Sequence, residues 1–313
     1  MVKEAKAKYD YLIRESRDVL LREDRDERLA YIKSEHWIGY GLATNVIMKL
    51  RELLFAPKKE RMPNVLIIGR TNNGKSMIAK RFCYLYSLIG KNEQSYDQHG
   101  DCKEIPVLYM QMPATPDIRR FYAAILHELG FQPRSSAYRI SALEPEIIGL
   151  CKELKVKMIV IDEIHNVLAG RKDQQREFLN VLRFLGNSLQ IPLICVGTKD
   201  AYLAIRSDDQ LENRFEPVLL PAWKYDKEYK SLLASYVSIM PLKKKSKLCS
   251  PALAKKILKM SEGVIGEIST IITKSAYFAA DHHWEEIDEF VLDNIDYKSP
   301  TERKQIFERT IRE

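Results

Sequence analysis

Gly69, Gly74, Lys75 and Ser76 have the types and spacing of a phosphate-binding loop, G-x-x-x-x-G-K-S. The loop follows a short apolar run at residues 65–68, whose length and β-branched content indicate a buried strand. In such a P-loop, successive backbone N–H groups point at an anion, the lysine neutralises the terminal phosphates and the hydroxyl binds Mg²⁺. A chance match is the alternative, but the strand before the motif and the apolar helix expected after it supply the context that a P-loop requires. The sequence therefore predicts a nucleotide site here.

Two carboxylates, Asp162 and Glu163, follow another apolar run at residues 158–161. The carboxyl end of a buried parallel strand is the edge at which α/β folds bind ligands. An apolar run ending in Asp-Glu is common by itself, but downstream of a P-loop it is typical of a Walker B motif. We expect Asp162 to hold Mg²⁺ together with Ser76. Glu163 would orient and deprotonate the attacking water, because in-line phosphoryl transfer depends mostly on positioning and charge neutralisation.

Two further polar residues stand next to predicted strands. Thr198 follows the strand expected at residues 192–196, where its hydroxyl can contact a γ-phosphate or the attacking water, a sensor role; it can equally cap the helix that begins near Asp200. Arg214 directly precedes the strand expected at residues 216–220, the place of an arginine finger that completes a neighbouring subunit's site. A surface ion pair is the alternative for Arg214.

The elements that must position these residues follow from the pattern of apolar runs. The sequence predicts strands at 65–68, 105–110, 158–161, 192–196 and 216–220, alternating with amphipathic helices. This order predicts an α/β fold, a doubly wound P-loop core with a parallel sheet, followed by a small helical lid domain and preceded by a helical N-terminal extension. The expected boundaries are 1–40 for the extension, 41–222 for the core, 223–299 for the lid and 300–313 for a charged tail, either a partner hook or a frayed end.

Composition favours a cytoplasmic protein that is not bound to a membrane. Of the 313 residues 30% are charged, no apolar run approaches the roughly 20 residues of a membrane span, and the N-terminus is too charged for a signal peptide. Five single cysteines lack metal-ligand spacing, so we expect reduced thiols and no metal besides nucleotide-bound Mg²⁺. A net charge of +7 favours a polyanionic partner without proving one.

Two other groups of residues are candidates for binding. Trp37 and Ile38, in the segment HWIGY, either form an apolar pocket for the adenine ring or pack an N-terminal segment. Around the helix expected at residues 118–129, hydroxyls and arginines can donate to phosphate oxygens of duplex DNA without reading bases. These DNA candidates, for which a solvated surface is the alternative, are Thr115, Arg119, Arg134 and Ser135. Thr115 is also the expected cap of that helix, with Pro116 at its first position.

The order of P-loop, Asp162-Glu163, Thr198 and Arg214, followed by a helical tail, resembles the AAA+ ATPases. More narrowly, the chain resembles the TniB/TnsC transposition regulators from Glu27 to about Ala280, through the stretches RMPNVLIIGRTNNGKS, VIDEIHNVLAG and ICVGTKDAYLAI. The resemblance implies ATP binding with Mg²⁺, a homo-oligomeric ring or helical filament on duplex DNA, and a link between a target-selection protein and a DDE-type transposase. The loop residues it places around the nucleotide are Gly69, Asn72, Asn73, Gly74, Lys75, Ser76 and Met77.

One position departs from the family pattern. AAA+ lids usually carry a second sensor arginine at the start of the third lid helix, where this sequence has Glu267. A carboxylate cannot neutralise a phosphate, so the site either lacks this contact or receives it from Lys274 on a later turn. We therefore expect slow intrinsic hydrolysis.

Two other functions compete with this interpretation. The run Asp162-Glu163-Ile164-His165 echoes the DEAH box of helicases, but one P-loop core leaves no room for the second motor domain of such enzymes. A helicase loader or remodelling switch that acts on a protein partner alone is the second alternative. Binding to duplex DNA distinguishes it from a transposition regulator.

Overall fold

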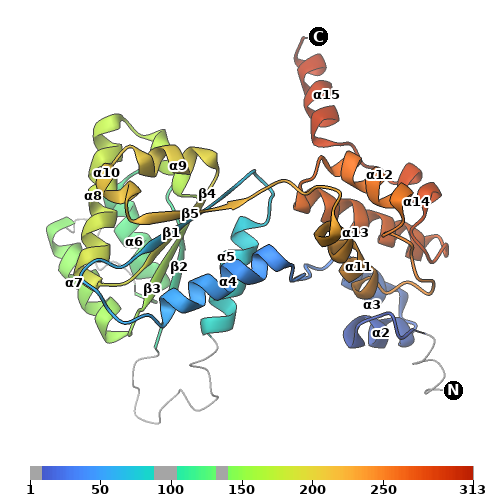
Figure 1. Ribbon diagram of the computed structural model, residues 1–313, viewed down its shortest axis with the longest axis horizontal. Coiled ribbons are helices and arrows are strands. Elements are labelled where there is room, and N and C mark those ends of the chain that lie inside the picture. Colours follow the sequence, from blue (N-terminus) through green and yellow to red (C-terminus); the bar gives the residue numbers. More distant parts are fainter. Residues whose placement is uncertain (1–8, 88–103, 132–139, 313) are drawn as a thin grey trace. The chain divides into compact units, whose positions relative to one another are not determined.

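The computed structural model describes residues 9–87, 104–131 and 140–312. These residues form two compact units, labelled by element in Figure 1. A helical unit combines both ends of the chain, Met1–Gly41 and Ala222–Glu313, and a sheet unit spans Leu42–Pro221. The N-terminal extension therefore shares a unit with the C-terminal helices, which the sequence alone did not indicate.

Within the described residues the sheet has five parallel strands in the order β2-β3-β4-β1-β5. Their bounds are β1 (Asn64–Gly69), β2 (Val107–Gln111), β3 (Met158–Asp162), β4 (Leu193–Gly197) and β5 (Phe215–Leu220). Every residue of β1, β3 and β4 is buried, as expected for strands covered on both faces, whose sequences are continuous apolar runs. The α/β fold class predicted from the sequence is confirmed.

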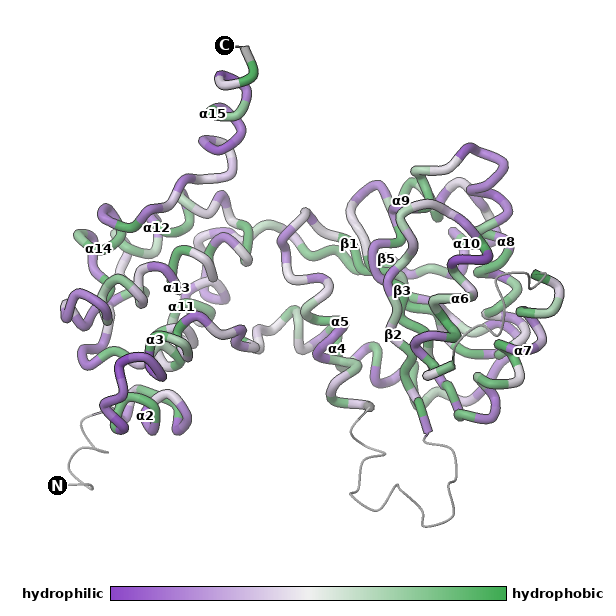
Figure 2. The backbone as a smooth tube through the Cα atoms, turned by 180° about the vertical axis from the view of Figure 1, so that it is seen from behind, coloured by the Kyte–Doolittle hydropathy of each residue, from purple (hydrophilic) through white to green (hydrophobic). Residues whose placement is uncertain are grey.

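Helices cover both faces of this sheet, with α7 and α8 on one side and α4 and α5 on the other (Figures 1 and 2). The main apolar core joins Leu108 and Ile161 of the strands to Phe121 of α6 and Phe178 of α8. The helices of this unit are α4 (Gly41–Leu54), α5 (Lys75–Ser87), α6 (Ile118–Glu128), α7 (Ile140–Glu153), the 3-10 helix η1 (Ile164–Ala169), α8 (Lys172–Leu189), α9 (Lys199–Arg206) and α10 (Asp209–Glu212).

The start of α6 differs from the expectation. Asp117, not Thr115, is its N-cap: the Asp117 backbone is extended, and its carboxylate accepts a hydrogen bond from the Arg120 backbone N–H at 2.9 Å. Pro116 consequently precedes the cap and is not the first helical residue. An Asp carboxylate also interacts favourably with the positive end of the helix dipole, which a threonine hydroxyl does not.

The helical unit packs α3 (Arg25–Lys33) against the C-terminal helices. Ile32 of α3 shares one apolar core with Leu233 of α11 and Ile272 of α13. The other helices pack around this core, and the helices of the unit are α2 (Arg14–Leu21), α3, α11 (Lys227–Ile239), α12 (Pro251–Ser261), α13 (Ile265–Asp281), α14 (Glu289–Asn294) and α15 (Pro300–Arg312).

The charged tail forms the helix α15, which runs away from the other helices of its unit (Figure 1). Figure 2 shows apolar and polar bands alternating along it, and Ile306, Phe307 and Ile311 are exposed. Across the described ranges, every helix falls short of the length or the apolar content that a bilayer-spanning segment needs.

Candidate functional site

The P-loop joins the carboxyl end of β1 to the start of α5. Asn72 and Gly74 both have a positive φ, 60° and 78°, a region open to glycine and tolerated by asparagine. A Cβ at Gly69 would lie 3.2 Å from the Cβ and the carbonyl oxygen of Leu220 on β5, so a larger residue there would push against the end of that strand. Positive-φ residues in such a loop are typical of the backbone turns whose N–H groups bind an anion.

Asn73 fastens the P-loop to the neighbouring strand. Its Nδ2 donates to the backbone carbonyls of Leu220 at 2.8 Å and of Pro221 at 3.1 Å, and only 2% of the residue is exposed. The sequence suggested that Asn73 contacts the nucleotide. In the structure its side chain holds the loop against the end of β5.

Lys75 begins α5 and is buried, with its Nζ donating to the Arg70 carbonyl of the loop at 2.7 Å. Burial lowers the pKa of Lys75, and the charges of Glu163 and Asp162 partly oppose this shift. The P-loop lysine and the two Walker B carboxylates therefore lie within electrostatic reach of one another. Of the two residues after Lys75, Ser76 is half-buried and Met77 is exposed.

Asp162, the last residue of β3, is held at both oxygens. Its Oδ2 accepts a hydrogen bond from the Tyr109 hydroxyl at 2.8 Å, and its Oδ1 accepts one from the Glu163 backbone N–H at 2.8 Å. Burial raises the pKa of Tyr109, and the hydrogen bond to Asp162 raises it further. The sequence interpretation missed Tyr109. The sequence carries no signal for this contact, which depends on strand register: Gln111 pairs with Asp162, and Tyr109, two residues earlier on β2, lies on the same face as Gln111.

Glu163 caps η1 in a left-handed backbone conformation, with φ 55° and ψ 35°. Its Oε2 lies 3.2 Å from Nε2 of His165, and 35% of the Glu163 side chain is exposed. Water can therefore reach the carboxylate.

Thr198 follows β4, whose pairing with β1 and β3 brings it to the same edge of the sheet. It is the N-cap residue of α9, but its side chain makes no capping bond and donates only a long hydrogen bond, 3.4 Å, to Asp200. Of the two roles open to Thr198, helix capping by the hydroxyl is not observed.

Arg214 lies at the opposite edge of the sheet. It directly precedes β5, and its carbonyl accepts the Asn64 backbone N–H at 2.9 Å where β1 begins. The P-loop starts at the other end of β1, five residues and about 17 Å away, because each strand residue advances about 3.3 Å. The guanidinium donates to Asn187 at 2.8 Å, and burial together with the charges of Arg61 and Arg183 lowers its pKa.

Two other groups of residues are candidates for binding the adenine ring or DNA. Ile38 lies in the apolar core of the helical unit, and Trp37, in the same unit, is half-buried. Thr115 and Arg119 are both exposed at the beginning of α6. Arg134 and Ser135 lie outside the described residues.

A family model described as the bacterial TniB protein matches residues 28–225. The chain is a member of the TniB family. No curated protein matches it by sequence.

Solved structures show that this TniB protein shares its fold with ORC and Cdc6 proteins. Aeropyrum pernix ORC1 in complex with DNA aligns at a TM-score of 0.59 and 13% identity, covering 89% of this chain and 69% of that one. Aeropyrum pernix ORC2 aligns at 0.58 and 15% identity, with 89% and 71% coverage. Cdc6p of Pyrobaculum aerophilum aligns at 0.55 and 14% identity, with 82% and 67% coverage. The fold is thus of the AAA+ type that the sequence resemblance implied.

The residues at the carboxyl edge of the TniB sheet fit a nucleoside triphosphate with its Mg²⁺. The loop has the positive-φ residues that are typical of an anion-binding turn, and Lys75 adds a buried ammonium. A hydroxyl from Ser76 and a carboxylate from Asp162 are the oxygen ligands that Mg²⁺ prefers.

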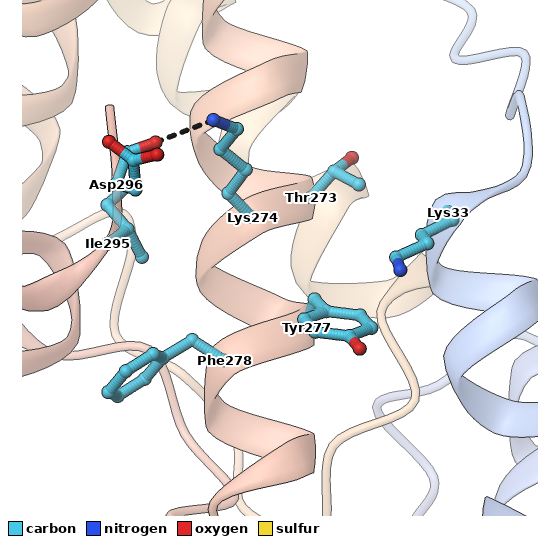
Figure 3. Close-up of a pocket in the computed structure, with 7 residues that line it drawn as sticks. All are labelled: Lys33, Thr273, Lys274, Tyr277, Phe278, Ile295 and Asp296. Carbon is cyan, nitrogen blue, oxygen red and sulfur yellow. Dashed lines mark hydrogen bonds between the residues drawn. The ribbon is translucent and has the colours of Figure 1, made fainter. Parts of the chain in front are cut away.

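The lid position that departs from the AAA+ pattern has a structural role. Glu267 accepts hydrogen bonds from the Tyr297 hydroxyl at 2.8 Å and from Arg303 Nη2 at 2.6 Å, so it anchors the first turn of α15 to α13. Lys274, the other candidate, donates to the carbonyl of Asp296 at the rim of a cavity of about 260 Å³ (Figure 3). On the other side of this cavity, Lys33 of α3 lies over the Tyr277 ring.

Proposed function

We propose that this TniB protein is an ATPase that assembles as a homo-oligomer on duplex DNA and regulates transposition in the cytoplasm. It would connect a target-selection protein to the transposase. The observation that carries the proposal is the division of the site: the P-loop, Asp162, Glu163 and Thr198 meet at one edge of the sheet, while Arg214 lies at the other. A nucleotide completed by Arg214 must be shared between two copies, so ATP acts as an assembly signal.

Each residue at the carboxyl edge has a task that its surroundings support. The loop N–H groups and Lys75 bind the phosphates, and Ser76 and Asp162 would hold Mg²⁺, which supplies positive charge to the phosphate oxygens when bound. Glu163 orients and deprotonates the water. The Thr198 hydroxyl, which does not cap its helix, would contact the γ-phosphate.

The DNA-binding part of the proposal rests on charge and exposure. Arg119 and Thr115 are exposed beside a helix N-terminus, where backbone and side-chain donors suit phosphate oxygens. A structural neighbour, ORC1, was solved in complex with DNA. Such contacts predict binding that depends little on base sequence and weakens steeply with salt.

Electron microscopy with duplex DNA and a slowly hydrolysed ATP analogue tests this function. We expect rings or helical filaments on DNA, and an affinity that falls with ionic strength. Arg119→Glu should weaken binding uniformly across sequences and reduce the salt slope by about 1. Absence of DNA binding at low salt with the analogue present would refute the proposal and favour a switch that acts on a protein partner alone.

Two substitutions separate nucleotide binding from hydrolysis. Lys75→Ala should abolish nucleotide-dependent assembly, because it removes the buried cation of the phosphate site. Glu163→Gln should retain binding and assembly but block hydrolysis, because it removes the base and leaves the phosphate concavity intact. Identical behaviour of the two variants in filament and hydrolysis assays would contradict these roles.

A further inference from the structure

Among the described residues, the side chain paired with the Glu163 carboxylate is the imidazole of His165. Glu163 Oε2 and His165 Nε2 are 3.2 Å apart, and the two side chains are 35% and 28% exposed. The contact joins two residues of one short turn, so it needs no rearrangement of distant segments to form.

The turn that carries both residues is fixed at several points. The Asn166 backbone N–H donates to the Glu163 carbonyl at 3.0 Å, and the Asn166 side chain donates to the Met112 carbonyl at the end of β2, at 3.3 Å. The β4 side is close as well: a Cβ at Gly197 would lie 3.5 Å from the His165 backbone nitrogen. His165 therefore projects from a rigid segment.

The hydrogen-bonding pattern decides which ring nitrogen carries the hydrogen. His165 Nδ1 is buried and has no hydrogen-bond partner among the described residues. A buried N–H without an acceptor costs more than a buried lone pair without a donor, since an N–H offers a single strong interaction that would be lost outright. The hydrogen therefore belongs on Nε2, which lies 3.2 Å from Glu163 Oε2.

We propose that His165 is a positioning residue for Glu163, an inference that rests on the proposed ATPase function. The histidine occupies Oε2 and leaves Oε1 to face the water. The water oxygen forms a bond to the γ-phosphorus, and Glu163 Oε1 takes one proton from that water. At the same time the bond between the γ-phosphorus and the β,γ-bridging oxygen breaks, and the electron pair of this bond leaves with ADP. A base oriented by a third group is the general arrangement of such sites.

The expected effect is on turnover and not on binding. Without His165, the half-exposed carboxylate samples other rotamers, and misplacement of a catalytic group by about 1 Å costs up to about 100-fold in rate. His165→Ala should therefore lower kcat about 10-fold to 100-fold, while nucleotide affinity stays within about twofold. His165→Gln should restore most of the rate, because its amide N–H stands near the place of Nε2.

The experiment measures kcat and KM for ATP in the presence of duplex DNA, with nucleotide affinity measured separately. His283→Ala, at a histidine of the helical unit, is the matched control and should match the parent. A parental or higher kcat in His165→Ala overturns the proposal. An equal loss of kcat and nucleotide affinity in His165→Ala also overturns it, as does a kcat of His165→Gln that stays as low as that of His165→Ala.

A second readout keeps the proposal separate from the proposed function. ¹⁵N spectra of the histidine rings should show His165 as the Nε2–H tautomer in the nucleotide-free protein, with His165→Gln supplying the assignment. Glu163→Ala should shift this signal. If the parent binds ATP but never hydrolyses it, the ATPase proposal fails and the positioning role fails with it. If the parent hydrolyses ATP but the ¹⁵N ring signal of His165 does not shift in Glu163→Ala, only the His165 proposal fails.

Discussion

The pair Arg28–Glu285 joins the N-terminal extension to the C-terminal helices, and we predict that Arg28→Ala strongly destabilises the helical unit. The guanidinium makes two hydrogen bonds to the Glu285 carboxylate, one of them 2.9 Å long, and a third to the Pro241 carbonyl at 2.7 Å. The side chains are only 12% and 9% exposed. Removing one partner therefore leaves a nearly buried charge.

The magnitude follows from what remains around Glu285. Breaking a buried ion pair by removing one partner costs about 3–5 kcal/mol. The Lys243 backbone N–H still donates to the carboxylate at 3.0 Å, and Lys243 Nζ lies 3.8 Å away, which reduces the penalty. We therefore expect a loss of about 2–3 kcal/mol, equivalent to a melting temperature about 6–9 °C lower for a unit of this size.

Calorimetry of the full chain at pH 7 measures this, with Arg22→Ala as control. Arg22 pairs with Glu27 but is 61% exposed, so its loss should cost less than about 0.5 kcal/mol. The double variant Arg28→Met/Glu285→Gln should recover much of the loss, because no unpaired charge remains. If Arg28→Ala melts within about 1 °C of Arg22→Ala, the reasoning about the buried pair is refuted.

The pH dependence of stability tests the pair Arg28–Glu285 independently. Burial alone would raise the pKa of Glu285, but hydrogen bonds from Arg28 and Lys243, together with their charges, outweigh it and hold the pKa below its usual value. A carboxyl whose pKa is lower in the folded state stabilises the fold above its unfolded pKa of about 4.3, and this contribution disappears as pH falls through the folded pKa. The difference between parent and Arg28→Ala should therefore be constant from about pH 6 to 8 and shrink below about pH 4.

Three further predictions concern the sheet unit. Tyr109→Phe should weaken Mg²⁺-dependent nucleotide affinity about 10-fold, because Asp162 loses the donor that orients it; titrations with and without Mg²⁺ measure this, and equal effects in both would contradict it. Asn73→Ala should lower the unfolding free energy by about 1–2 kcal/mol in thermal melts through the loss of its bonds to β5; an unchanged melt would contradict it. Arg214→Ala and Lys75→Ala should each abolish hydrolysis, yet a mixture of the two should regain part of it, since some interfaces combine an intact Lys75 with an intact Arg214. A mixture that stays inactive would argue against a shared site.

The strands and the P-loop could be predicted because their signals are local. Residues 65–68 are apolar and mostly β-branched, and the strand observed there, β1, exceeds the prediction by one residue at each end. Gly74 stands where the backbone needs a positive φ, so the motif and the geometry share one cause. Predictions of this kind depend only on neighbours in sequence.

Contacts between distant residues could not be predicted. The bond from Tyr109 to Asp162 depends on the register of two strands that are 53 residues apart, and the pair Arg28–Glu285 spans 257 residues. The cap of α6 could not be predicted either, because Thr115 and Asp117 both have capping side chains and the fold decides which one caps the helix. Pattern supplies candidates in such cases, and packing selects among them.

The position of Arg214 bears on function more than any single hydrogen bond. In a parallel sheet all strands run the same way, so a residue before β5 and the loop after β1 are separated by the full length of the strands. This distance, about 17 Å, far exceeds the length of an arginine side chain. Arg214 therefore has no role at the P-loop of its own chain. The nearby charges of Arg61 and Arg183, which lower the pKa of Arg214, concentrate positive charge at this edge. This charge would favour contact with the phosphates of a nucleotide that is bound to a second copy of the protein.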